Sequence, residues 1–232
     1  MYSISICNSK KTEKRKTTLM KNLYIFGDSF STNFSTIDEV SIEESWPVLL
    51  SNKLNYELQS YASAGISNYG ILHKMYHNIN SLDKDDIVII GITFYDRLYD
   101  FWKNIGIDLR NDAIKGFNES EIQFYKHKLS NKNEMMQYTE NALLQYNFII
   151  ENLKRYTNVF FWNMDKCGLP IFNKMVKHHS KNYITPIEAE CWMDFCNKTP
   201  LWWQKNNDRH FGKEGHKEFF LYLYQYIQTN LI

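Results

Sequence analysis

Residues 86–93 read DIVIIGIT, an apolar and largely β-branched run that follows acidic residues. Such a run, with no alternation of polar and apolar positions, predicts a strand buried on both faces, as in a parallel sheet. Shorter apolar runs lie on either side of it, at residues 23–26 (LYIF), 58–62 (LQSYA) and 159–162 (VFFW). We expect these four segments to form one sheet.

Amphipathic segments alternate with these strands. Residues 46–54, which carry a proline near the start, and residues 68–79 both show the spacing of a helix. Residues 136–155 form a longer apolar stripe, and a last stripe runs from His216 to Ile227. Repeated β-α-β units imply a mostly parallel sheet with helices on both faces, which is a three-layer α/β domain. We expect a single domain over residues 21–232.

Two aromatic-rich stretches interrupt the alternation, at about residues 94–135 and 164–206. They are too long for plain connections and too aromatic for flexible linkers, so we interpret them as insertions. Both follow strands, at the edge where α/β sheets bind ligands, and are therefore candidate lids. Their aromatic side chains either stack on sugar rings, line an acyl pocket or form a small core of the insertions. They are Tyr95, Tyr99, Trp102, Trp192, Trp202 and Trp203.

The composition excludes several classes. The 232 residues are 44% hydrophobic, which excludes a wholly disordered protein, and no apolar run reaches the roughly 18 residues of a membrane span. Residues 1–20 hold five basic residues against Glu13, a local charge of +4, so the overall charge of +1 leaves −3 for the rest. We therefore expect no nucleic-acid partner and no membrane partner.

The N-terminal residues 1–20 do not read as a secretory signal, because a short apolar patch precedes the charges. We interpret this segment as a flexible basic extension and Met20 as the natural start. A cytoplasmic location is expected. The four cysteines form no CxxC pair, which disfavours structural zinc and fits free thiols. The pair His178-His179 has no carboxylate at ligand spacing and is interpreted as a solvated loop, so no metal site is predicted.

Two segments carry groups for nucleophilic catalysis. Ser29, in the run GDSFS after the first strand, is expected at a strand-to-helix turn that exposes its hydroxyl near backbone amides. Asp28 is expected to cap that turn. Near the other end, Asp208 and His210 share one loop before the last helix, and a serine nucleophile needs such a base with an orienting carboxylate. His216 lies on the apolar stripe and is interpreted as a core residue.

These segments resemble the SGNH (GDSL-type) hydrolase superfamily. The resemblance is carried by FGDSFS, SWPVLLSNKL, ASAGISN, IVIIGIT and DRHFGKEGH, from about residue 21 to the end. It implies a flavodoxin-like α/β/α sandwich and hydrolysis of esters, often O-acetyl groups on carbohydrate, with no cofactor. It also implies that Ser29 is the nucleophile, His210 the base, and the N–H groups of Ser29 and Gly65 part of the oxyanion hole.

The chain departs from the family pattern in two blocks. Thr93 stands where the family has an oxyanion-binding asparagine, so the Thr93 hydroxyl or the Asn68 amide is the candidate third donor. The usual Asp-x-x-His spacing would use the residue before Asp208, yet Asp208 is our choice for the orienting carboxylate. Arg97 and Tyr95 are candidate substrate-binding residues, with a plain salt bridge as the alternative for Arg97.

Three functions follow as hypotheses. The first is a serine esterase or deacetylase that acts through an acyl-enzyme on a small-molecule or glycan ester. The second is a catalytically weak SGNH-like module that binds a glycan or a protein through its aromatic insertions. The third, a small-ligand or nucleotide-binding flavodoxin-like protein with no hydrolytic role, is disfavoured because GDSFSTNFS has too few glycines to cradle phosphate. Divergent family members include phage proteins, so association with a phage particle stays open, as does the oligomeric state.

Overall fold

The structure is a computed structural model. It describes residues 20–32, 40–79, 82–94, 97–100, 103, 105–108, 117–165, 169–186, 189, 191–199 and 210–231.

A parallel four-stranded sheet forms the centre, in the order β2-β1-β3-β6. The strands are β1 (Asn22–Phe26), β2 (Glu57–Ser60), β3 (Ile87–Ile92) and β6 (Asn158–Asn163). Every residue of β3 is buried, as its continuous apolar sequence predicts. A separate antiparallel hairpin of β4 (Arg97–Asp100) and β5 (Ile105–Asp108) follows β3 along the chain.

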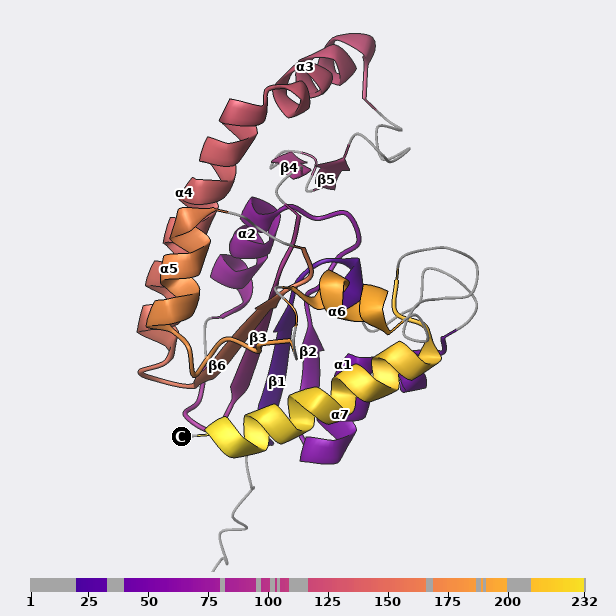
Figure 1. The fold of residues 1–232 in the computed structure, drawn as a ribbon, viewed down its shortest axis with the longest axis vertical. Helices are drawn as coiled ribbons and strands as arrows, with labels where there is room; N and C mark the ends of the chain where they lie inside the picture. Colours follow the sequence, from indigo (N-terminus) through magenta and orange to yellow (C-terminus); the bar gives the residue numbers. More distant parts are fainter. Residues whose placement is uncertain are drawn as a thin grey trace, which may run out of the picture.

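Helices cover both faces of this sheet (Figure 1). On one face, α2 (Asn68–Asn78), α4 (Lys132–Leu153) and α5 (Pro170–His178) pack on Tyr24, Phe26 and their neighbours. On the other, α1 (Trp46–Leu54), α6 (Trp192–Lys198) and α7 (Lys213–Asn230) pack on Leu23 and Ile25. The side chains of β1 therefore alternate between two hydrophobic cores. This is the predicted three-layer α/β/α sandwich, and the fold class is confirmed.

The predicted elements agree closely with the observed ones. The helix predicted over residues 46–54 is α1 itself, and the four predicted strands are β1, β2, β3 and β6. The long helix begins earlier than predicted, at Lys132, because the Asn131 side chain caps it by accepting a hydrogen bond from the Glu134 N–H.

The two predicted insertions contain regular structure in their described residues. The first includes β4, β5 and α3 (Glu119–Ser130), which lie beyond the carboxyl ends of the central strands (Figure 1). The second includes α5 and α6. None of the described helices has both the length and the apolar character that a membrane crossing requires.

Candidate active site

Ser29 opens a tight 3-10 turn directly after β1. The turn is η1 (Ser29–Ser31), and Asp28 caps it because its Oδ1 accepts a hydrogen bond from the Phe30 N–H at 3.1 Å. The predicted capping role of Asp28 is thus confirmed. A Cβ at Gly27 would lie 2.2 Å from Ser31 Oγ, so the turn needs a glycine at this position.

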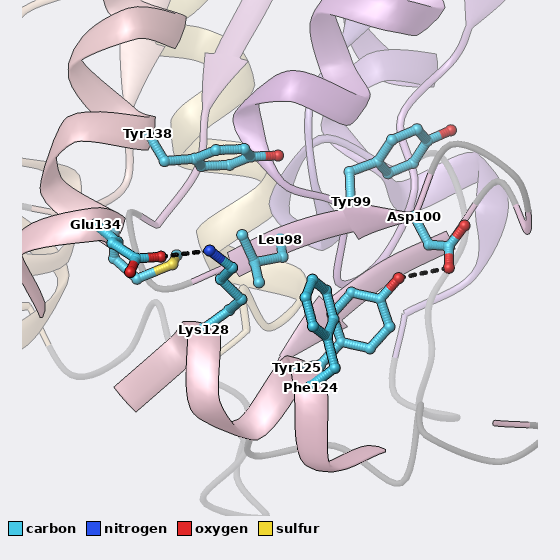
Figure 2. A pocket seen from close by; sticks show the side chains of 9 residues that line it. Leu98, Tyr99, Asp100, Phe124, Tyr125, Lys128, Glu134 and Tyr138 are labelled. Atoms are coloured by element: carbon cyan, nitrogen blue, oxygen red, sulfur yellow. Dashed lines mark hydrogen bonds and ion pairs between the residues drawn. The ribbon is translucent and has the colours of Figure 1, made fainter. Parts of the chain in front are cut away.

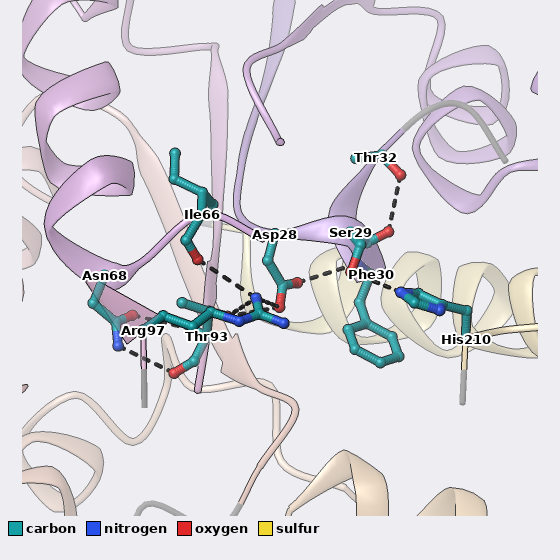
Figure 3. A network of polar contacts seen from close by, with 9 residues as sticks. All are labelled: Asp28, Ser29, Phe30, Thr32, Ile66, Asn68, Thr93, Arg97 and His210. Carbon is teal, nitrogen blue, oxygen red and sulfur yellow. Dashed lines mark hydrogen bonds and ion pairs between the residues drawn. The ribbon is translucent and has the colours of Figure 1, made fainter. Parts of the chain in front are cut away.

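His210 lies against the Ser29 hydroxyl, although 181 positions separate them in the sequence (Figure 3). Its Nε2 is 2.8 Å from Ser29 Oγ, which is hydrogen-bond distance. The imidazole ring stacks on the Phe30 ring, with centroids 4.8 Å apart and planes 23° from parallel. Phe211, the next residue, is buried in the core and fixes the chain that carries His210. The structure therefore brings a serine and a histidine into the relation that a nucleophile needs with its base.

The Asp28 carboxylate is buried and ion-paired with Arg97. Its Oδ2 accepts a hydrogen bond from the Thr93 hydroxyl at 2.6 Å and one from Arg97 Nη1 at 3.0 Å (Figure 3). Arg97 Nη1 also donates to Thr93 Oγ1 at 2.7 Å, and the guanidinium lies over the Phe94 ring. The Arg97 side chain is 8% exposed. Of the two roles considered for Arg97, the structure shows the salt bridge.

Of the two proposed third oxyanion donors, Thr93 is engaged through its hydroxyl and Asn68 through one of its two amide N–H groups. The Thr93 hydroxyl donates its single proton to Asp28. The Asn68 amide pairs with the Thr93 backbone, donating from Nδ2 to the Thr93 carbonyl at 3.1 Å and accepting from the Thr93 N–H at 3.0 Å. In this arrangement both side chains hold the end of β3 in place beside the nucleophile turn.

The backbone N–H groups of Ser29 and Gly65 are available for a ligand. Neither donates a hydrogen bond to another described residue. Gly65 has a φ of 72°, a left-handed conformation that favours glycine. The loop that carries it is tied to the nucleophile turn, because the Ser63 N–H donates to the Gly27 carbonyl at 3.0 Å.

The other predicted site residues divide into two groups. Trp192 and Tyr99 belong to the main cores, and Tyr99 also contributes to the wall of a cavity in the first insertion. The indole N–H of Trp192 donates to the Ile184 carbonyl, and Trp192 packs on Phe219. The remaining ones lie outside the described residues: Tyr95, Trp102, Trp202, Trp203 and Asp208.

The predicted solvated loop at His178-His179 is wrong for His179, which is 1% exposed. A carboxylate that the sequence spacing does not indicate lies beside the pair. Glu151, from the neighbouring helix α4, lies 3.2 Å from His178 Nε2. Sequence spacing could not reveal it, since α4 and α5 meet only in the fold.

His216 is a buried neutral histidine behind the site. Its Nδ1 accepts a hydrogen bond from the Trp46 N–H at 3.2 Å. Burial, with a smaller contribution from His210, lowers the pKa of His216 to about 4. Its expected role as a core residue is consistent with this environment.

We expect His216 to make the protein less stable in acid. In the unfolded chain it binds a proton near pH 6.5, whereas in the fold it does so only near pH 4, so protons favour the unfolded state between these values. The free energy of unfolding should fall by about 2 kcal/mol from this group between pH 8 and pH 5. Urea denaturation of the wild type and of His216→Gln at both pH values measures it. An equal fall in both proteins would contradict this assignment.

A cavity of about 360 Å³ opens in the first insertion, between β4 and helices α3 and α4. Figure 2 shows aromatic rings around it, with Lys128 paired to Glu134 at one side and the Tyr125 hydroxyl donating to Asp100 at the other. Burial raises the pKa of Tyr138, another wall residue, to about 12, so its phenol stays protonated. Because β4 begins at Arg97, the cavity adjoins the segment that contacts Asp28.

No protein-family model matches the chain, and no curated protein is similar to it in sequence. Among solved structures it resembles a lipolytic protein of the G-D-S-L family from Veillonella parvula DSM 2008, at 11% identity and a TM-score of 0.50 over 90% of this chain and 97% of that one. It is also similar to the psychrotrophic esterase EstA from Pseudoalteromonas sp., at 15% identity and a TM-score of 0.44 over 90% and 97% of the two chains. A third neighbour is the acetyl xylan esterase AlAXEase, at 14% identity and 0.48 over 88% and 98%. At these identities the likeness shows the fold, which is the one that the SGNH resemblance implies.

Proposed function

We propose that this chain, folded like a G-D-S-L lipolytic protein, is a serine hydrolase that cleaves an acyl ester through an acyl-enzyme. The observation that carries the proposal is the 2.8 Å contact between Ser29 Oγ and His210 Nε2. A serine hydroxyl is a weak nucleophile until a base within hydrogen-bond reach takes its proton. Both residues come from sequence blocks that resemble those of the SGNH family.

In the first step, Ser29 Oγ attacks the ester carbonyl carbon while His210 Nε2 accepts the hydroxyl proton. The C–O bond to the leaving alcohol then breaks, and His210 returns the proton to that alcohol. In the second step His210 takes a proton from a water molecule, which attacks the acyl carbonyl carbon. The bond from that carbon to Ser29 Oγ then breaks, and His210 returns the proton to Oγ, which releases the acid and free Ser29. Asp208 is proposed to orient the imidazole.

The developing oxyanion is proposed to bind the N–H groups of Ser29 and Gly65, which are not used by other described residues. Asn68 and Thr93 contribute indirectly, by fixing the end of β3. Arg97 neutralises the buried Asp28 and so supports the turn that carries Ser29. We propose that the substrate is an ester of a short acyl group, such as an O-acetyl group on a carbohydrate, in line with the family resemblance.

Labelling with a fluorophosphonate probe tests the proposal. Such a probe reacts with an activated serine hydroxyl and leaves a phosphonyl group that peptide mass spectrometry can locate. We expect modification of Ser29 in the wild type and a strong loss of labelling in His210→Ala, because the base is then absent. Equal labelling of Ser29 in both proteins would show that His210 does not activate it.

A second candidate is a binding module with little catalytic power. Two observations favour it: the Thr93 hydroxyl donates its single proton to Asp28, and an aromatic cavity lies in the first insertion. One missing oxyanion donor typically lowers the rate by about 10²–10³-fold. This candidate would be favoured if the folded wild type is not labelled by the fluorophosphonate probe but is retained on an affinity column that carries a glycan.

A further inference from the structure

A second group of chemically reactive side chains lies where α4 and α5 end. Glu151 belongs to the last turn of α4, His178 is the last residue of α5, and His179 follows it. One ligand atom from each of the three lies within 4.8 Å of the others. Since α4 ends shortly before β6 begins, the group lies at the amino ends of the strands, opposite the edge that carries Ser29.

His179 is oriented as a metal ligand would be. Its Nε2 lies 3.0 Å from the Asn147 side-chain oxygen, so the ring donates its proton there and Nδ1 keeps its lone pair. That Nδ1 is fully buried and has no hydrogen-bond partner among the described residues. It faces Glu151 Oε2 at 3.9 Å. A lone pair and a carboxylate oxygen at this separation repel each other, and a proton on Nδ1 or a cation bound between the two atoms removes the repulsion.

The spacing fits a zinc ion. Zinc binds histidine nitrogen and carboxylate oxygen at about 2.0–2.2 Å, which places the ligands of a tetrahedral site roughly 3.3–3.6 Å apart. The observed separations from Glu151 Oε2 are 3.2 Å to His178 Nε2 and 3.9 Å to His179 Nδ1. His178 is exposed and Glu151 is half-buried, so both side chains have room to rotate toward a shared ion.

We propose that Glu151, His178 and His179 bind one Zn²⁺ ion, which clamps the end of α4 to the end of α5. Asn147 acts as the outer partner that fixes the His179 ring. Lys154 competes with the metal, because its Nζ lies 2.6 Å from the same Glu151 Oε2 and has to move away. Arg155 approaches only the other oxygen of Glu151, at 4.0 Å. A solvent molecule completes the tetrahedron.

The test is a titration of the chelator-treated full-length protein with ZnCl₂, followed by calorimetry and thermal unfolding. We expect one tight site and a rise in Tm of roughly 5–10 °C when free zinc exceeds Kd about a hundredfold. Replacement of zinc by Co²⁺ should give the visible absorption bands of a tetrahedral centre. The two ligands that solvent reaches, Glu151 and His178, are changed first, because His179 is buried and its removal disturbs the core. Glu151→Gln and His178→Gln should each weaken binding at least about tenfold.

Lys154→Met should change the zinc affinity in the opposite direction to Glu151→Gln and His178→Gln. If the ammonium group competes with zinc for Glu151, its removal should tighten binding severalfold. A role of the cluster as a simple salt-bridge network predicts no such gain.

The matched control is the pair His73 and His77 on α2, whose Nε2 atoms are 3.1 Å apart and exposed. The double variant His73→Gln/His77→Gln should keep the tight site and the rise in Tm. Loss of zinc binding in this double variant, with unchanged binding in Glu151→Gln, would overturn the proposal. So would the absence of any stoichiometric binding by the wild type.

Discussion

Replacement of Ser29 by alanine should lower kcat/KM for p-nitrophenyl acetate by about 10³-fold or more and abolish fluorophosphonate labelling. The reason is geometric, because Ser29 Oγ is the atom that His210 Nε2 contacts at 2.8 Å. Without that oxygen no acyl-enzyme forms, and any residual rate comes from binding and polarising the ester. Steady-state kinetics of the purified variant, with far-UV circular dichroism to show that it is folded, measure the effect.

Ser31→Ala is the matched control for this prediction. Ser31 lies in the same 3-10 turn and is buried, but its Oγ has no hydrogen-bond partner among the described residues. Removal of an unpartnered buried hydroxyl costs little, so stability and activity should stay near the wild-type values. Turnover that survives in Ser29→Ala and disappears in Ser31→Ala would reject Ser29 as the nucleophile.

The sequence predicts the fold well because the apolar runs in it are the segments that the fold buries. The strand β3 is buried along its whole length, and its sequence has no polar position that could be mistaken for a surface. In β1 the side chains from Leu23 to Phe26 face two different cores in turn, yet all four are hydrophobic, which identifies a central parallel strand. The helix boundaries are less well predicted, since the cap Asn131 precedes the apolar stripe of α4.

The candidate site is predicted only in part. Ser29 and His210 lie in recognisable motifs, and the parallel topology places both near the same edge of the sheet. The pairing of Arg97 with Asp28 could not be read from the sequence, because 69 positions separate them and β1 meets β3 only in the fold. For Trp192 the sequence left a role in ligand binding and a role in a core both open, and the fold uses it as core.

We expect Arg97→Met to destabilise the protein by about 3–5 kcal/mol. The change removes the cation that lies 3.0 Å from a carboxylate of which the side chain is only 3% exposed, and leaves that charge buried without its ion-pair partner. The remaining hydrogen bonds from Thr93 and Phe30 offset only part of this cost. Urea denaturation at pH 7 measures the loss in the free energy of unfolding.

Two further variants separate burial of a charge from loss of packing. In Asp28→Asn/Arg97→Met the buried charge is gone, while an amide oxygen can still cap the Phe30 N–H, so most of the lost stability should return. Arg155→Met is the matched surface control, because Arg155 is exposed and its 4.0 Å contact with Glu151 should contribute less than about 1 kcal/mol. If Arg97→Met lowers the free energy of unfolding no more than Arg155→Met does, the buried Asp28 carboxylate does not need Arg97 as its ion-pair partner. A large cost that the double variant reverses means that Arg97 supports the turn of Ser29 by neutralising Asp28.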